Sequence, residues 1–535
     1  MRRPRLPLSL LLSAAAAIVL GVSGRGQTPA ASPRTLLDRF GPPPIERGII
    51  PIEARAPDGP DAVRRRSIQP ATGPVDRAGA SGARYLPGRV IVKFRDSVSA
   101  ASRLSALSTV SRSASLSQRP SHADFDIVQI DPNDDAEWVA RVFSQRPDVE
   151  YAQAAYRMYS RLKPNDALYA QQWNLPLIDM ERAWDIQPTP GSAITVAVLD
   201  TGLAYTSATV QFHASAFRVD ADGFFEPPNG TGTLYPALGD LTLQFVPATQ
   251  LITTGRIVAP HDFIWDDNLP LDLDGHGTHV SGTIGQLTND GIGTAGVAFN
   301  VKLMPVKVLD GVWDNVFGAP NFGTDDIVAR GIRYAADNGA KILNMSLGRS
   351  GPTSPVIDAA LTYAVGKGAF VAIAAGNDFE DGNPSEVPAE SANRIAGVVS
   401  VAAVDRTKAH AYYSSSGSWV ELAAPGGSFR GFGAGGGILQ QTLDLDLVET
   451  YNNSVFSAPR FDALAYFYFT GTSQAAPHVA GVAAMLMQQG ITDPAAIEAA
   501  LEHFATDLGD AGRDPLFGFG LIEARNALRG LGLAK

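Results

Sequence analysis

The chain has 535 residues and no cysteine. The absence of cysteine excludes disulfides, thiolate zinc sites, a cysteine nucleophile and a lipid-anchored thiol. Beyond the amino-terminal stretch, no segment is apolar for long enough to cross a bilayer. A hydrophobic content of 45% with 18% charged residues is typical of a globular protein with a sizeable core. At this length we expect two or more regions.

Basic residues are scarce in the larger part of the chain. Residues 1–163 carry 24 Lys and Arg against 15 Asp and Glu, whereas residues 164–535 carry 19 against 39. The balance of −20 in the second part argues against nucleic acid as its partner, because binding phosphate requires positive charge. The balance of +9 in the first part favours docking of the first part on the second.

The amino terminus has the order of a secretory signal. Three arginines precede an apolar run from Leu6 to about Val22, and the small residues Ser23 and Gly24 follow. We therefore predict that residues 1–24 are a cleaved signal peptide and that the protein is secreted, extracellular or periplasmic. No stable membrane anchor would remain after cleavage, and an uncleaved anchor is the alternative.

Residues 25–163 fall into two segments of different composition and pattern. Residues 25–83 are rich in Pro, Arg and Ala without sustained periodicity, which predicts a disordered linker. The RRR run at 64–66 is more typical of a solvated cluster than of a processing site. Residues 84–163 show strand-like alternation in RVIVKF and DFDIVQID and then a helix followed by a strand, which predicts a small α+β unit.

Residues 164–535 alternate continuous apolar runs with helical stretches. AITVAVLDTG, VKLMPVKVLD, KILNMSLG, AFVAIAAGN and VVSVAAVD predict buried strands, and DDIVARGIRYAADNG and PVIDAALTYAVGKG predict helices between them. The pattern predicts an α/β fold, a doubly wound and mostly parallel sheet with helices on both faces. Ligands bind at the carboxyl ends of strands in such sheets. This chain has Asp200, Ser346 and Asn377 there.

Two histidines, His276 and His279, share one face of a predicted helix start. Because the chain has no HExxH pattern and no thiolate, a general base is a better interpretation of His276 than a zinc ligand. Asp200 and Asn377, taken singly, are typical of turns. Taken with a histidine, a carboxylate can fix the tautomer of the base and an amide can stabilise an oxyanion.

Ser473, in GTSQAAPHVAG, fits two roles. Serine is a preferred helix N-cap, and an Ala-rich helix follows it. A serine hydroxyl also becomes a nucleophile when a base takes its proton and a carboxylate orients that base. Asp200 and His276 supply the carboxylate and the base, which favours the nucleophile.

Five segments in order, VAVLDTG, GHGTHVSGT, NMSLG, AAGN and GTSQAAPHVAG, resemble the motifs of the subtilisin-like serine proteases, or subtilases. The resemblance covers the chain from about Pro164 to its end, and the order Asp, His, Ser is that of the family. It implies a serine endopeptidase that acts on proteins or peptides through an acyl-enzyme. A catalytically silent scaffold and a GxSxG esterase are the rivals, and the filled catalytic positions and the GTSQA context disfavour them.

The resemblance also implies individual roles. Asp200 would orient His276, His276 would be the base, Ser473 the nucleophile, and Asn377 with the Ser473 amide the oxyanion hole. The residues implied to bind the substrate chain are Ser346, Leu347, Gly348, Ala375 and Gly376. His279 and His478 lie in the motifs and are expected to be structural.

Residues 84–163 resemble the inhibitory propeptides of these proteases. The resemblance implies a zymogen whose propeptide assists folding, occupies the cleft as an intramolecular inhibitor, and is removed by autoprocessing near residues 159–163. The catalytic domain would then be residues 164–535, with insertions at about 205–260 and 427–468 that are expected to form loops around the cleft.

The family requires no cofactor for its chemistry, but QLTNDGIGTAG resembles a loop that binds a structural calcium in many relatives. Asn289 would give its side chain, and Leu287, Ile292 and Thr294 their carbonyls. The carboxylate that the family adds to this site has no clear match after DTG, and an ordinary glycine-rich loop is the alternative.

Four acidic residues follow Asn377, namely Asp378, Glu380, Asp381 and Glu386. We expect them to lie on a solvated loop. The alternative concerns Glu386, which falls close to the family's specificity pocket, where a carboxylate would favour Lys or Arg.

Overall fold

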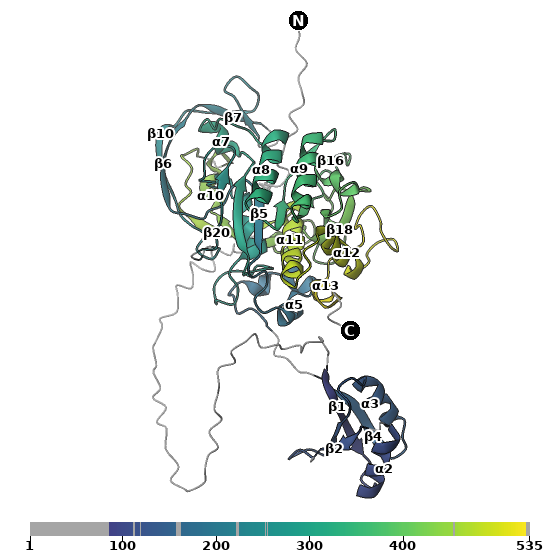
Figure 1. Ribbon diagram of the computed structural model, residues 1–535. Coiled ribbons are helices and arrows are strands. Elements are labelled where there is room, and N and C mark those ends of the chain that lie inside the picture. The colour runs from purple at the N-terminus through teal and green to yellow at the C-terminus, as the bar shows by residue number, and fades with distance from the viewer. Residues whose placement is uncertain are drawn as a thin grey trace, which may run out of the picture. The chain divides into compact units, whose positions relative to one another are not determined.

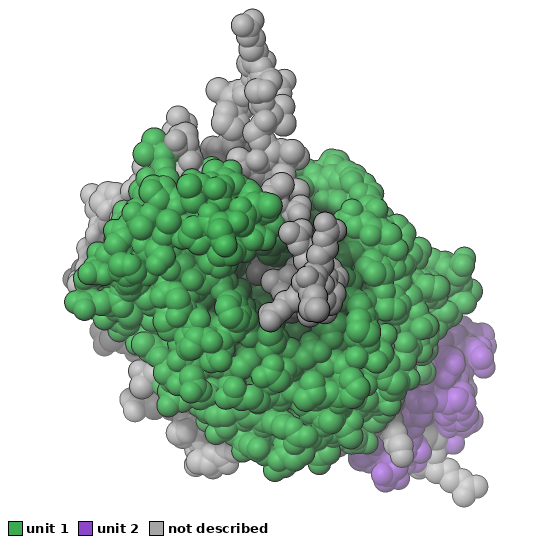
Figure 2. All heavy atoms as spheres, turned by 90° about the horizontal axis from the view of Figure 1, so that it is seen from above, with its two compact units in different colours: residues 1–41, 161–530 green, residues 42–160, 531–535 purple. Residues whose placement is uncertain are grey.

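The computed structural model describes residues 85–110, 113–117, 119–156, 162–220, 224–251, 253, 255–452 and 455–530. They belong to two compact units: the first unit along the chain ends with Tyr156 and is the purple unit 2 of Figure 2, and the second begins with Leu162 and is the green unit 1 of that figure. The expected signal peptide, the linker at 25–83 and residues 159–161 of the maturation window lie outside the described residues. None of the helices in the described ranges has the length and apolarity that a bilayer crossing needs.

The first unit is an antiparallel sheet with two helices (Figure 1), in the order β2-β3-β1-β4. Its elements are β1 (Tyr85–Phe94), α2 (Ala100–Val110), β2 (Ser115–Leu116), β3 (Asp126–Gln129), α3 (Ala136–Ser144) and β4 (Val149–Tyr156). Alternate residues of β1, such as Val90 and Val92, are fully buried against Phe143 of α3 in one apolar core. The small α+β unit expected from the sequence is confirmed.

The second unit is built on a seven-stranded sheet whose strands are all parallel, in the order β11-β12-β5-β13-β15-β17-β18. Its strands are β5 (Thr195–Asp200), β11 (His261–Asp262), β12 (Lys302–Lys307), β13 (Ile342–Met345), β15 (Phe370–Ala374), β17 (Val398–Val404) and β18 (Val420–Pro425). The central strands are buried along their whole length, as their continuous apolar runs predict. The parallel α/β sheet is therefore confirmed.

Helices cover both faces of this sheet (Figure 1). On one face lie α8 (Asp325–Asp337) and α9 (Pro355–Gly366), and on the other α6 (His276–Gly285) and α11 (Thr472–Gln488). Chain order reverses at β5, since β12 lies on one side of it and β13 on the other. Open α/β sheets bind ligands beyond the carboxyl ends of the strands at such a switch point, and here β5 and β13 end at Asp200 and Met345.

Shorter elements complete the second unit. The helices are η1 (Tyr169–Gln171), α4 (Asn174–Leu177), α5 (Met180–Ile186), α7 (Val312–Val316), η2 (Ala389–Asn393), η3 (Ala434–Gly436), α10 (Leu445–Val448), η4 (Thr450–Asn452), α12 (Pro494–Phe504) and α13 (Ala524–Gly530). The strands are β6 (Ala208–Ala214), β7 (Phe217–Val219), β8 (Phe225–Glu226), β9 (Thr233–Tyr235), β10 (Gly239–Phe245), β14 (Arg349–Ser350), β16 (Glu386–Val387), β19 (Ile438–Leu443) and β20 (Leu464–Phe469).

The two insertions contain strands as well as loops. The first forms the pair β6–β10 and the small sheet β8-β7-β9, and the second forms the hairpin β19–β20. An aromatic cluster joins them: the Tyr235 hydroxyl of the first donates to the Tyr451 carbonyl of the second at 2.6 Å, and the Tyr235 and Phe456 rings lie 5.0 Å apart. The indole of Trp313 in α7 stacks on Phe456 and donates to the Val448 carbonyl. The insertions therefore share one apolar core.

Candidate active site

Asp200 and His276 form a buried hydrogen bond at the carboxyl end of β5. Asp200 ends β5 and His276 begins α6, and His276 Nδ1 lies 2.7 Å from Asp200 Oδ1 with both side chains at most 1% exposed. The approach of α6 to the β5 turn requires glycine, because a Cβ at Gly277 would lie 2.2 Å from the Gly202 carbonyl oxygen. Local glycines thus bring a carboxylate and an imidazole together.

The charge around His276 favours its protonated form. Burial lowers the pKa of His276, but the carboxylates of Asp200, Asp274 and Asp272 outweigh burial and raise this pKa to about 9. The other ring nitrogen, Nε2, is buried and has no hydrogen-bond partner among the described residues. It is therefore the nitrogen that can exchange a proton with a reacting group.

Ser473 is the second residue of α11, so its backbone N–H has no intrahelical acceptor. Pro477, four residues later, has no N–H to donate to the Ser473 carbonyl. The Ser346 hydroxyl donates to that carbonyl instead, at 2.7 Å. The Ser473 hydroxyl in turn donates to the Ser346 carbonyl at 3.4 Å. The end of β13 therefore holds Ser473 from two sides.

Asn377, just after β15, is fixed by the residue before the serine. Its Oδ1 accepts hydrogen bonds from the backbone N–H of Thr472 at 2.9 Å and from the Thr472 hydroxyl at 3.0 Å. Because the oxygen is occupied in this way, the amide nitrogen is directed to other acceptors. Asn377 is thus hydrogen-bonded to the residue directly before Ser473, whose own N–H has no acceptor within the helix.

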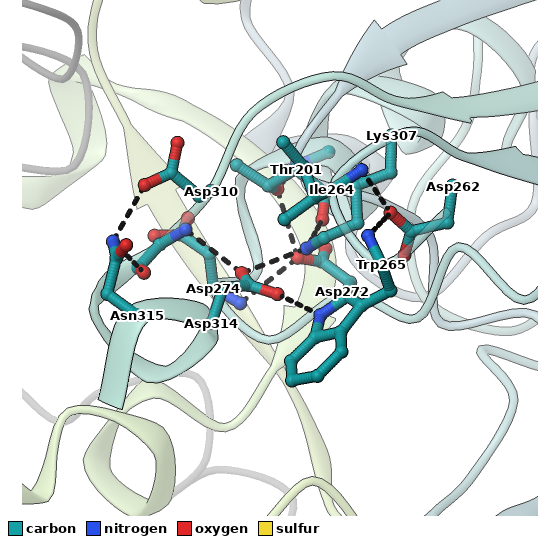
Figure 3. Close-up of polar contacts among 12 residues, drawn as sticks. Thr201, Asp262, Ile264, Trp265, Asp272, Asp274, Lys307, Asp310, Asp314 and Asn315 are labelled. Atoms are coloured by element: carbon teal, nitrogen blue, oxygen red, sulfur yellow. Dashed lines mark hydrogen bonds and ion pairs between the residues drawn. The ribbon is translucent and has the colours of Figure 1, made fainter. Parts of the chain in front are cut away.

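One buried carboxylate ties the two ends of the site together (Figure 3). Asp272, 1% exposed, accepts from the Thr201 hydroxyl at 3.0 Å, and it accepts from both the N–H and the hydroxyl of Thr278 at 2.9 and 2.6 Å. The Thr201 hydroxyl also accepts from the N–H of Gly277. The turn after Asp200 is therefore bonded to the first turn of α6.

Behind this carboxylate lies a buried ion pair, also in Figure 3. The ammonium of Lys307, fully buried, donates to the Thr201 carbonyl at 2.6 Å and to Asp314 Oδ2 at 3.0 Å. The indole of Trp265 donates to the other oxygen of Asp314 at 2.7 Å. Separating the two charges would leave each one buried and uncompensated, so Lys307 stays paired with Asp314. Its hydrogen bond to the Thr201 carbonyl therefore holds the turn after β5 in one position.

The residues expected to bind substrate lie in two segments after β13 and β15. Ser346, Leu347 and Ala375 are buried, and Gly348 and Gly376 are half-buried. The expectation that the following acidic residues are all solvated is wrong for Glu386, which is only 3% exposed. Pairing of β16 with β14 carries Glu386 inward, whereas Glu380 and Asp381 are exposed.

The two other motif histidines have structural contacts. His279 Nε2 lies 3.1 Å from the Ile438 carbonyl, and its ring stacks on Phe469 with centroids 4.1 Å apart. His478 lies 2.8 Å from the Asn174 amide. Burial lowers the pKa to about 3 for His279 and to about 4 for His478, so both are neutral near pH 7.

The loop considered for calcium is held by a carboxylate that sequence reasoning missed. Asp166 accepts from the N–H of Asn289 with both oxygens, at 2.8 and 3.0 Å. Thr294 is buried and donates to Gln440, while Ile292 is 57% exposed. Elsewhere in the described part of the chain, three carboxylates come within 4.8 Å of one another: Glu421, Glu498 and Glu502.

Comparisons with known proteins identify the family of this chain. Residues 191–520 match the model of the subtilase family, and residues 72–154 match that of the fervidolysin N-terminal prodomain. A thermophilic serine proteinase of Bacillus sp. (strain AK1) is 30% identical over 446 residues, which are 83% of this chain and 88% of that protein.

Two further likenesses are with an extracellular protease of Xanthomonas campestris and with a solved structure. The Xanthomonas protein is 30% identical over 387 residues, which are 70% of this chain and 59% of that protein. The crystal structure of fervidolysin from Fervidobacterium pennivorans, a keratinolytic enzyme related to subtilisin, is 25% identical with a TM-score of 0.49, covering 83% of this chain and 61% of that one.

Replacing Asp272 by Asn should destabilise the second unit. The amide would present an N–H₂ group to donors that now share a carboxylate, leaving at least one buried group unpaired. We expect a loss of about 1–3 kcal/mol in the free energy of unfolding, measured by urea denaturation. Asp267→Asn, an exposed carboxylate on the same loop, is the control, and equal stability of the two variants would contradict the role given to Asp272.

Proposed function

Because this chain belongs to the subtilase family and is a serine endopeptidase, we propose that it hydrolyses peptide bonds through Asp200, His276 and Ser473. The observation that carries the proposal is the buried Asp200–His276 hydrogen bond, which leaves His276 Nε2 unpaired. In the proposed reaction Nε2 takes the Ser473 proton, and the serine oxygen attacks the substrate carbonyl to form a tetrahedral intermediate. His276 then gives the proton to the amine as the C–N bond breaks, which leaves an acyl-enzyme. Water, which loses a proton to Nε2, attacks the acyl-enzyme in the same way, and the Ser473 oxygen leaves with that proton.

The oxyanion would be bound by two donors. The contacts of Asn377 with Thr472 support this role, because they occupy its carbonyl oxygen and leave its amide N–H₂ to a ligand. The Ser473 N–H, at the amino-terminal end of α11, is the second donor. Because Ser473 Oγ donates to the Ser346 carbonyl in this structure, its hydrogen bond to Nε2 would form on substrate binding.

We further propose that the protein is made as a zymogen, which its prodomain keeps inactive. Residues 84–163 would inhibit the enzyme and be removed by its own cleavage near residues 159–163, and residues 1–24 would be lost on secretion. The likeness to a protease described as extracellular supports this course. So does the charge contrast between residues 84–163, with 12 Lys and Arg against 9 Asp and Glu, and the acidic enzyme. Substrates are then proteins or peptides outside the cytoplasm.

Replacing Ser473 by Ala should abolish both self-cleavage and reaction with a fluorophosphonate. The wild-type precursor should shorten on refolding and take up the label stoichiometrically, because only an activated serine reacts. Electrophoresis and mass spectrometry measure both. Thr472→Ser, which keeps the hydroxyl that holds Asn377, is the control and should retain labelling. An S473A precursor that still shortens at the wild-type rate would falsify the assignment.

The pH profile should report His276. The base acts only when Nε2 is unprotonated, so kcat/KM should rise with pH. The apparent pKa of this rising limb should lie above 6.5, in the direction of about 9. Asp200→Asn removes the first carboxylate that raises this pKa, so the limb should move to lower pH while kcat falls by roughly 10⁴-fold. An uncharged peptide substrate assayed from about pH 5 to 10 measures both. A wild-type limb below 6.5 would contradict the assignment.

We also propose a structural calcium at the loop of Asn289, held by that side chain and by the carbonyls of Leu287, Ile292 and Thr294. An all-oxygen donor set suits Ca²⁺, and Asp166 supports the site by holding the Asn289 backbone at a positive φ of 67°. The ion would supply no chemistry, only stability.

Chelation should then lower the Tm of the inactive S473A enzyme, which cannot digest itself. Added Ca²⁺ should restore the Tm, because the ion binds only the folded loop, and Asn289→Ala should lose the response. Differential scanning calorimetry measures the shift. An identical Tm in EDTA and in Ca²⁺ would show that the folded loop needs no metal and would contradict the proposed site.

A further inference from the structure

Glu386 lies against both segments that flank Ser473. A Cβ at Gly376 would lie 2.4 Å from Glu386 Cγ, and one at Gly348 would lie 3.7 Å from Glu386 Oε2. Gly376 directly precedes Asn377, and Gly348 is two residues after Ser346. Because these two glycines have no side chains, Glu386 is the ionisable residue that approaches the backbone at both positions.

The Glu386 carboxyl has an acidic neighbour, and no cation of the described residues forms an ion pair with it. Burial and then the Asp378 carboxyl raise the pKa of Glu386 to about 8. Glu386 Oε1 has no hydrogen-bond partner among the described residues. The nearby guanidinium of Arg349 is occupied, since it donates to both oxygens of Asp325 at 2.8 and 2.6 Å. A buried carboxyl, Glu386, beside a half-buried one, Asp378, is therefore left with one unfilled acceptor, an arrangement that a cation would stabilise.

We propose that Glu386, with Asp378, binds the side chain of the residue on the acyl side of the scissile bond, and that the enzyme prefers Lys or Arg there. The inference rests on the proposed function, because it places the substrate carbonyl between Ser473 and Asn377. With the carbonyl placed there, the residue that bears it would direct its side chain toward Gly348 and Gly376. A lysine ammonium or arginine guanidinium would displace the proton of the carboxyl pair and fill the free acceptor.

The chain's own maturation window contains such a residue. Between residues 159 and 163 the basic residues are Arg161 and Lys163, and Pro164 follows Lys163. The bond after Arg161 is therefore the cleavable one with an ordinary amide. Its product would begin at Leu162, whose backbone N–H donates to Asp185 Oδ1 at 2.6 Å. Cleavage would convert this group to an ammonium beside a carboxylate, a stronger pairing.

Matched peptides that differ only at the acyl-side residue test the preference. The wild-type kcat/KM should be at least about tenfold higher for Lys or Arg than for Gln, Leu or Phe. Glu386→Gln should lower the Arg-to-Leu ratio of kcat/KM by about tenfold to a hundredfold, the usual effect of losing a hydrogen bond to a charged group. Glu386→Asp should restore part of that ratio. Glu380→Gln, an exposed carboxylate on the same loop, should leave it unchanged.

The outcomes separate the two proposals. Fluorophosphonate titration counts active sites in every preparation, so an enzyme that is not labelled contradicts the proposed function. A labelled wild type that prefers Leu or Phe overturns the inference by itself, whether or not the variants fold. An unchanged ratio in E386Q overturns it as well.

The first product of refolding gives a second readout. Amino-terminal sequencing should find Leu162, and Arg161→Gln should slow processing, whereas Arg161→Lys should not. A first product that follows an uncharged residue would contradict the preference for Lys and Arg.

Discussion

The buried hydrogen bond between Asp200 and His276 is the constraint on which the rest of the second unit depends. Two buried titratable groups are costly unless their positions are fixed, the more so here because Asp200 Oδ2 and His276 Nε2 have no hydrogen-bond partner among the described residues. Asp272 supplies that fixation, because it binds the turn after Asp200 and the first turn of α6 at once. The Lys307–Asp314 pair then holds the same turn from the sheet. The geometry of the reacting groups is thus set by contacts that lie beneath them.

The position of Ser473, the proposed nucleophile, depends on a comparable arrangement. A proline inside a helix normally costs a hydrogen bond, and Pro477 frees the carbonyl of Ser473 itself. The Ser346 hydroxyl takes that carbonyl, so the missing helical bond becomes a link between α11 and β13. The helix start that makes Ser473 resemble a cap therefore also fixes the backbone of the proposed nucleophile.

The sequence predicted what depends on local pattern and family motif. Continuous apolar runs identified β5, β13 and β15, because a strand buried on both faces has no polar side. It missed α2 (Ala100–Val110), whose serines break the apolar stripe of a helix. Strands within the insertions were expected as loops, since they pair with one another and share a core only after folding.

Long-range contacts account for the two errors at the site. Asp166 reaches the loop of Asn289 across 123 positions in the chain, and no motif connects them. Glu386 follows three acidic residues, which is typical of a solvated loop, yet its pairing partner Ser350 decides its burial. In both cases tertiary structure overrides a local pattern.

Buried carboxyls create a conflict between activity and stability at alkaline pH. Burial raises the pKa of Glu386 to about 8, and burial with Glu498 raises those of Glu421 and Glu502 to about 9 and 7. Above pH 4.5 the unfolded chain releases these protons while the folded unit retains them, so stability falls as pH rises until the folded groups ionise too. His276, the proposed base, whose pKa is raised to about 9, would gain its active form over the same range. The enzyme would therefore work fastest where its acidic core holds it together least.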